Sequence, residues 1–183
     1  MKRIIIVSTV VLLFIVSITS CKKIASAIFS GLEFNVPDVA LSVPIVPFVA
    51  TSEIQFGTAT QNINLDSVVK ANTANVFGAD IVKTVSIKTV TITITNADDL
   101  NNLSNFESAR ITLTSNNNTN PIDIANVTFP NTNATSFVFT PTDSKELVSY
   151  LKGSTLTYTV YGKNRKITTK TLNFVASVRL KVN

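Results

Sequence analysis

The chain of 183 residues has no histidine, no tryptophan, one cysteine and five glycines. The lack of histidine excludes the usual general base near neutral pH, the serine–histidine triad and the commonest transition-metal ligand. The glycines are too widely spaced for a phosphate-binding loop or a dinucleotide fingerprint: Gly31, Gly57, Gly78, Gly153 and Gly162. We therefore predict no catalytic residue, no metal ligand and no cofactor.

A single cysteine excludes an internal disulfide, and a chain of this length buries enough surface to fold without one. Lysine and arginine total 16 against 11 aspartates and glutamates. The basic residues that follow the N-terminal segment are scattered between Lys70 and Lys181, whereas nucleic-acid binders concentrate them on one face. The sequence therefore predicts no nucleic-acid partner. We interpret the densest cluster, Lys163, Arg165 and Lys166, as a solvated hairpin turn.

The N-terminal segment has the composition of an export signal. Lys2 and Arg3 precede an apolar run over 4–18, which matches the length of a signal-peptide core. The run closes with Ile-Thr-Ser-Cys at 18–21, which resembles the lipobox of bacterial lipoproteins. That resemblance implies a diacylglycerol on the sulfur of Cys21 and cleavage before it, and two or three acyl chains anchor a protein stably.

The resemblance gives the expected organisation of the chain. Residues 1–20 are the signal peptide, 21–33 the lipidated cysteine and a tether, and 34–183 a single domain. An uncleaved membrane-spanning anchor is the alternative, because the apolar run is close to the lower length limit for a span. Lys22 is not the aspartate that favours retention in the inner membrane, so we expect the outer membrane. The composition of the sequence is similar to that of Bacteroidetes lipoproteins. Whether the domain lies on the periplasmic side or on the cell surface stays open.

Beyond the tether, apolar and polar residues alternate with period two, which indicates half-buried strands. Three prolines in 34–47 indicate an edge strand and a turn. Alternation is clearest over 172–182, where every second residue from Leu172 is apolar. The remaining expected strands are 52–57, 81–95, 107–114, 122–129, 135–140 and 155–161.

Two details of pairing are predicted. We expect 155–161 and 172–182 to form a terminal hairpin through the turn residues Gly162, Lys163 and Asn164. The apolar parity switches within 81–95, as one extra residue near Lys88 would require, so a β-bulge is expected there.

Helix is scarce. Asp143 followed by Glu146 resembles a capping box, which predicts a helix of about three turns with Leu147, Tyr150 and Leu151 on one face and a left-handed cap at Gly153. A second short helix is expected over 65–71. These features predict an all-β fold, an antiparallel β-sandwich that is immunoglobulin-like in general architecture, with one or two short helices. An open β-barrel is the alternative.

Three candidate sites remain. Asp98 and Asp99, among asparagines, suit either a hard cation or a polar turn. Tyr161 is the tyrosine expected to be most exposed and is a candidate glycan contact. Asp66-Ser67-Val68 resembles the O-glycosylation motif of Bacteroidetes, which implies a glycan on Ser67, and the alternative is a helix start capped by Asp66.

The function expected from the sequence is a non-enzymatic role in binding, adhesion or assembly of the envelope. The membrane is contacted through the lipid on Cys21, and an envelope protein or a glycan is the expected partner. The alternatives are a glycan-active hydrolase that uses scattered carboxylates and a carrier of lipids or other hydrophobic ligands.

Overall fold

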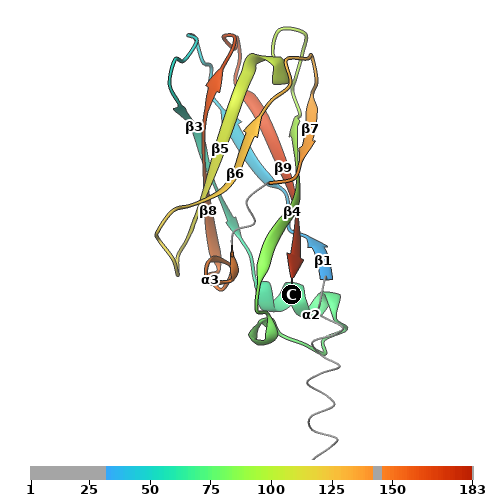
Figure 1. Cartoon of the computed structure of the whole chain (residues 1–183). Coiled ribbons are helices and arrows are strands. Elements are labelled where there is room, and N and C mark those ends of the chain that lie inside the picture. Colours follow the sequence, from blue (N-terminus) through green and yellow to red (C-terminus); the bar gives the residue numbers. More distant parts are fainter. Residues whose placement is uncertain (1–31, 142–145, 183) are drawn as a thin grey trace, which may run out of the picture.

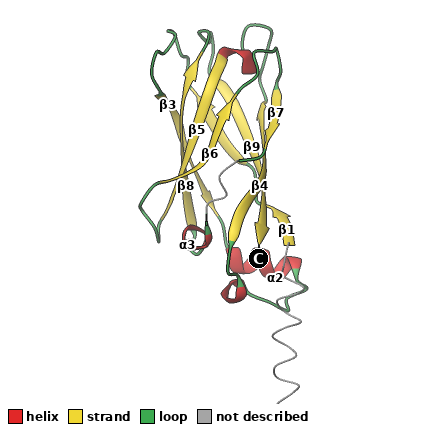
Figure 2. Cartoon of the chain, viewed as in Figure 1, coloured by secondary structure: helices red, strands yellow, loops and turns green. Residues whose placement is uncertain are grey.

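A computed structural model describes residues 32–141 and 146–182. Here two antiparallel sheets pack face to face without closing into a barrel, which confirms the predicted β-sandwich (Figures 1 and 2). The five-stranded sheet contains β1 (Leu32–Asn35), β2 (Val39–Val43), β4 (Val85–Ile94), β7 (Ser136–Phe139) and β9 (Leu172–Val182). The four-stranded sheet contains β3 (Ile54–Asn62), β5 (Phe106–Ser115), β6 (Ile122–Thr128) and β8 (Thr155–Asn164).

Strand β9 is the central element of the five-stranded sheet. It pairs with β4 along one side and with β1 and β2 along the other, and β7 continues the sheet beyond β4. Its alternating apolar residues belong to the cores between the sheets, as their parity predicts: Leu172, Phe174, Ala176, Val178, Leu180 and Val182. The four-stranded sheet has the order β3-β8-β5-β6.

The predicted β-bulge is confirmed. In the ladder between β4 and β9, Ile87 pairs with Leu180 and Thr89 pairs with Arg179, so Lys88 is the extra residue. An extra residue reverses which side of the strand faces the core, and this explains the switch in apolar parity.

The predicted terminal hairpin is wrong. Strand β8 pairs with β3 and β5, whereas β9 belongs to the other sheet. The expected turn residues Gly162, Lys163 and Asn164 form the end of β8, and residues 165–171 then cross from one sheet to the other. Alternation identifies the buried side of a strand but not its partner, and both strands alternate equally well in different sheets.

The predicted edge strand over 34–47 is confirmed, but it consists of two short pieces. Strands β1 and β2 are separated by Val36, Pro37 and Asp38, and both pair with β9. Proline cannot donate a backbone hydrogen bond, so the interruption falls where the chain contains one.

Helix α2 (Leu65–Asn72) confirms the helix expected over 65–71. Its cap is Asn64, whose side-chain oxygen accepts a hydrogen bond from the Ser67 backbone N–H at 2.9 Å. The expectation that Asp66 caps this helix is therefore wrong. Asp66 lies in the first turn, where the helix dipole stabilises a negative charge. Its carboxylate forms an ion pair with the Lys70 ammonium at 2.7 Å.

Helix α3 (Val148–Leu151) is a single turn, so the predicted three-turn helix is wrong. Asp143 lies outside the described residues. Glu146 accepts hydrogen bonds at Oε1 from the N–H groups of Val85 (3.1 Å) and Val148 (2.8 Å), which couples the start of α3 to β4. Gly153 is not in the left-handed conformation that was predicted. A side chain there would collide with Asn116, because a Cβ would lie 2.5 Å from its Oδ1.

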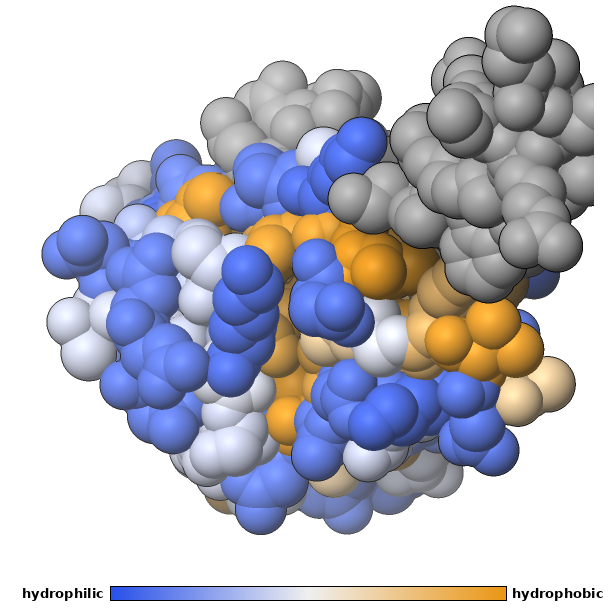
Figure 3. Space-filling model, turned by 90° about the horizontal axis from the view of Figure 1, so that it is seen from below, coloured by the Kyte–Doolittle hydropathy of each residue, from blue (hydrophilic) through white to orange (hydrophobic). Residues whose placement is uncertain are grey.

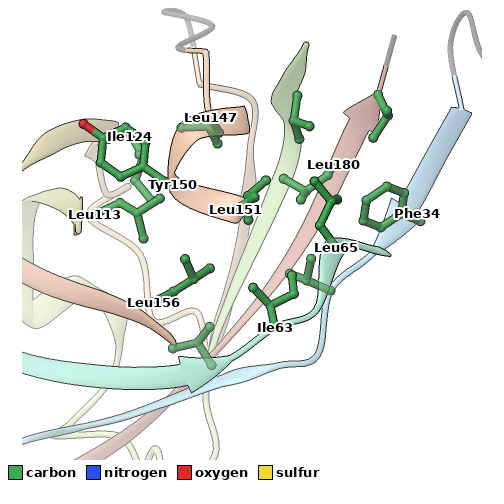
Figure 4. Close-up of a cluster of buried hydrophobic side chains, with 14 of the residues drawn as sticks. Phe34, Ile63, Leu65, Leu113, Ile124, Leu147, Tyr150, Leu151, Leu156 and Leu180 are labelled. Atoms are coloured by element: carbon green, nitrogen blue, oxygen red, sulfur yellow. The ribbon is translucent and has the colours of Figure 1, made fainter. Parts of the chain in front are cut away.

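The core consists of two clusters of buried side chains, one toward each end of the sandwich. The first cluster includes side chains of α2 and α3, and among its members are Leu65, Leu113, Leu156 and Leu180 (Figure 4). Hydrophobic residues also form a band on the surface of this end, between hydrophilic side chains (Figure 3). The second cluster is aromatic: the Phe106 ring packs edge-on against neighbouring phenylalanine rings with centroid distances of 5.3 to 6.3 Å.

Candidate functional site

Loops gather at the end of the sandwich opposite α2 and α3 (Figure 1). They join β2 to β3 (44–53), β4 to β5 (95–105), β6 to β7 (129–135) and β8 to β9 (165–171). We call this part the loop end. The loop over 95–105 includes the 3-10 turn Leu103–Asn105, and a second described 3-10 turn, Ala79–Ile81, lies near α2.

An apolar patch covers three of these loops. Seven large hydrophobic side chains are exposed among the described residues, and five belong to the loop end, with exposed fractions between 49% and 72%: Ile45, Phe48, Val49, Leu100 and Ile167. Single exposed hydrophobic residues are common on protein surfaces, but a concentration at one end indicates a contact surface.

Asn105 holds two of the patch loops together. Its side chain is 1% exposed, and its Nδ2 donates hydrogen bonds to the backbone oxygens of Leu100 (3.0 Å) and Ile167 (2.8 Å). Its Oδ1 accepts a hydrogen bond from the Asn102 N–H at 2.9 Å, which completes a capping box. One amide group therefore fixes the backbone at two patch residues.

Asn164 attaches the loop over 44–53 in the same way. Its Nδ2 donates to the backbone oxygens of Phe48 (2.7 Å) and Lys166 (3.0 Å), and its Oδ1 accepts from the Ala50 N–H at 2.9 Å. Thr168 and Val46 exchange two further bonds, one backbone pair at 3.0 Å and one from the Val46 N–H to the threonine hydroxyl at 2.8 Å. The loop over 165–171 is thus the common support of the patch.

Asp98 lies at the edge of this hydrogen-bond network. Its bonds decide between the two interpretations of Asp98 and Asp99, a cation site or a polar turn. Its Oδ1 accepts bonds from the N–H groups of Leu100 and Asn101, and its Oδ2 pairs with Lys170 at 2.6 Å. The bond from Lys170, followed by that from Asn101, lowers the pKa of Asp98 to about 2. Asp98 therefore organises a polar turn, and the described residues contain no group of three or more acidic, histidine or cysteine side chains placed to hold a metal ion.

The basic cluster does not form the solvated hairpin turn that was predicted. Lys163 belongs to β8, and Arg165 donates from its guanidinium to the backbone oxygens of Phe106 (2.5 Å) and Phe129 (2.8 Å). Arg165 thereby ties the loop over 129–135 to β5. The residue is structural because charged donors satisfy backbone carbonyls at the end of the aromatic core.

The hydrogen-bond network, rather than the patch side chains, holds the backbone of these loops. Buried polar groups must be hydrogen-bonded, and in the described residues every fully buried side-chain nitrogen or oxygen has a partner. The loops are therefore shaped by amide and hydroxyl groups, while the apolar side chains of the patch point to solvent and contribute little to packing.

The other predicted site residues lie elsewhere. Cys21 is outside the described residues. Ser67 is exposed in the first turn of α2, so the predicted glycan on it stays a prediction. Tyr161 is only half-buried, and the guanidinium of Arg110 lies 4.5 Å from the centre of its ring, so one face of this candidate glycan contact is already covered.

Arg110 also organises two carboxylates. It bonds to Glu53 at 3.0 Å and to Asp123 at 3.1 Å. These bonds raise the pKa of Arg110, with that from Glu53 the larger cause. Glu53 and Asp123 are therefore joined through one guanidinium in an ion-pair network on the outer face of the four-stranded sheet.

An apolar cavity of about 80 Å³ lies between the sheets, where residues of both core clusters meet. This is about half the roughly 150 Å³ of an engineered cavity that takes up benzene. An acyl chain does not fit into it, so the cavity gives no support to the carrier alternative.

No helix in the described part of the chain has the length and apolar character to cross a membrane.

Comparison with known proteins adds little. No family model and no curated protein matches the chain. Among solved structures, an infectious bursal disease virus chain is 10% identical over 83% of this chain and 32% of that one, with a TM-score of 0.33. A chain of the Triatoma virus empty capsid is 8% identical over 85% of this chain and 89% of that one, with a TM-score of 0.36. A Nora virus structure is 7% identical over 85% of this chain and 61% of that one, with a TM-score of 0.29. Matches this distant carry no information on function.

Sequence reasoning missed the loop end. The segment 44–49 reads Pro-Ile-Val-Pro-Phe-Val, and its two prolines exclude a central strand while its other residues are apolar. Apolar residues that no regular element can bury are a signal for an exposed contact surface, and this signal was present.

Proposed function

We propose that this protein is an exported, lipid-anchored lipoprotein of a bacterial envelope that binds a protein partner through its loop end and has no enzymatic activity. The observation that carries the proposal is the set of five exposed apolar side chains on three loops whose backbones are fixed by buried asparagines. Preorganised loops lose little conformational entropy on binding, and exposed apolar centres are typical of protein interfaces.

The position of the patch agrees with this role. Leu32, where the described chain begins, pairs with Val182 at the far end of β9. The first and last residues of β9 lie about 33 Å apart, at about 3.3 Å for each of the ten steps along its eleven residues, and the strand begins next to the loop over 165–171. A lipid on Cys21 would therefore tether the domain at one end and present the apolar patch at the other.

The anchor is tested by metabolic labelling with a fatty acid. We expect the native chain to be labelled and to fractionate with the outer membrane, and the Cys21→Ala variant to lose the label. Labelling that persists in the variant would overturn the anchor. Protease accessibility on intact cells then separates surface display, where the loop end meets an external partner, from a periplasmic position.

The patch is tested by photocrosslinking in the producing cells. A photoreactive amino acid is placed at Phe48 or Leu100, with Val138 as the matched control because it is an exposed apolar residue of β7, 60% exposed. We expect one protein adduct from the two patch positions and none from Val138, and an Ile167→Asp substitution should abolish it. The same adducts from all three positions, or none from the patch, would refute a partner at the loop end.

A further inference from the structure

A polar hollow lies on the outer face of the five-stranded sheet, away from the loop end. Its volume is about 350 Å³, within the roughly 300–1,000 Å³ range of small-ligand sites. Residues from four segments line it, all of them polar except Val178: Asn35, Asp38, Thr89, Thr91, Ser177, Val178 and Arg179.

Two bulges at the same level of β9 create this hollow. On one side, Asn35 pairs with Arg179 and Val39 pairs with Ala176. The three residues 36–38 between β1 and β2 therefore lie opposite only two residues of β9, 177 and 178. On the other side, the bulge at Lys88 falls where Thr89 pairs with Arg179. A bulge bends its strand and redirects side chains, and bulges are common beside functional sites.

The first bulge delivers a carboxylate to the hollow. Asp38 accepts a bond at Oδ1 from the Ser177 hydroxyl at 2.6 Å. Within the described residues its Oδ2 accepts no hydrogen bond, and the Thr89 and Thr91 hydroxyls bond to no described side chain. This side of the hollow therefore offers an acceptor and hydroxyl groups to a ligand.

Arg179 supplies the opposite chemistry. Its Nε bonds to Glu33 at 3.2 Å, which orients the side chain, and its two terminal nitrogens have no partner in the described residues. Glu33 also pairs with Lys88 at 2.8 Å, and Lys181 lies close enough to act on it electrostatically. Of these charged residues only Asp38 and Arg179 line the hollow, so the guanidinium of Arg179 is the cationic group that a ligand would meet there. A guanidinium with two free nitrogens matches a carboxylate.

We propose that this hollow binds a saccharide that carries a carboxylate, that is, a uronic acid unit. Arg179 holds the ligand carboxylate, while Asp38, Asn35 and the threonine hydroxyls accept and donate hydrogen bonds to the sugar hydroxyls. The lining contains no aromatic side chain, so binding depends on hydrogen bonds rather than on stacking, and we expect an affinity in the millimolar range.

The test uses ligand-observed saturation-transfer NMR with the full chain in detergent and trigalacturonate as probe. Maltotriose, a neutral sugar of similar size, is the comparison. We expect saturable transfer to trigalacturonate and at least about tenfold weaker binding of maltotriose, because a hydrogen bond to a charged group contributes about that factor. Arg179→Lys, which keeps the charge but loses the two-nitrogen fork, should weaken trigalacturonate binding by about tenfold.

Two variants provide controls. Thr91→Val in the hollow should weaken binding, whereas Thr60→Val, at an exposed position in β3 of the other sheet, should leave it unchanged. Leu100→Ser alters only the apolar patch and should also have no effect, so failure here is distinguishable from failure of the proposed function. No saturable transfer, equal binding of both sugars, or equal binding by the Arg179 and Thr60 variants would overturn the proposal.

Discussion

Replacement of Asn105 by alanine should destabilise the whole protein although the residue lies in a loop. The substitution removes three hydrogen bonds, two donated to the oxygens of Leu100 and Ile167 and one accepted from Asn102. The buried Asn102 N–H then has no partner, which costs about 1–3 kcal/mol, and each bond to a part-buried carbonyl contributes about 0.5–1.5 kcal/mol. We expect a loss of about 3 kcal/mol in the free energy of unfolding, or about 6–12 °C in Tm for a chain of this size.

The assay is urea and thermal unfolding followed by circular dichroism, because the chain has no tryptophan to serve as a fluorescent probe. Asn116→Ala is the matched control. Its side chain is exposed at the other end of the sandwich and bonds to Ser154 and Thr155, so we expect a loss below about 1 kcal/mol. If the Asn105 variant loses no more than this control, the asparagine network does not hold the loop end and the reasoning is refuted.

Three further changes test other parts of the structure. Ala109→Val places a methyl group toward the cavity between the sheets and should raise stability by about 0.5–2 kcal/mol in urea titrations; a loss would mean that the cavity is already filled. Asp98→Asn should flatten the dependence of stability on pH in acid. The Asp98 carboxylate contributes stability fully above its unfolded pKa near 4, and this contribution is lost as the pH falls through its folded pKa of about 2. An acid unfolding profile that the substitution leaves unchanged would contradict the pair with Lys170. Gly162→Ala should destabilise by about 1–3 kcal/mol, because a Cβ would lie 2.2 Å from the Ser108 oxygen, and a neutral result in thermal unfolding would show that β5 can shift.

The fold class was predictable because the sequence alternates over long stretches. Over β9 the period-two pattern identified every core residue, and the switch in parity near Lys88 located a bulge. Both inferences depend only on the geometry of a single strand. The partner of β8 was not predictable in this way, since pairing depends on which sheet a strand enters.

The loop end could not be predicted for a different reason. Asparagines at 101, 102, 105 and 164 are ordinary turn residues in a sequence, yet all four are buried here, and all but Asn102 bond across loops. Their partners lie up to 116 residues away, as for Asn164 and Phe48. Local patterns carry no information on such distances. The polar hollow depends in the same way on strand order, because β9 must lie between the two bulged strands.

The division of the core into two clusters has a consequence for how the molecule opens. Each end of the sandwich rests on its own set of buried side chains, and the two sets meet around the small cavity. Groups of contacts that are separated in this way tend to open as separate cooperative units with different amide hydrogen-exchange protection. Fraying around α2 and α3 would then leave the aromatic half of the sandwich folded, and with it the loop end.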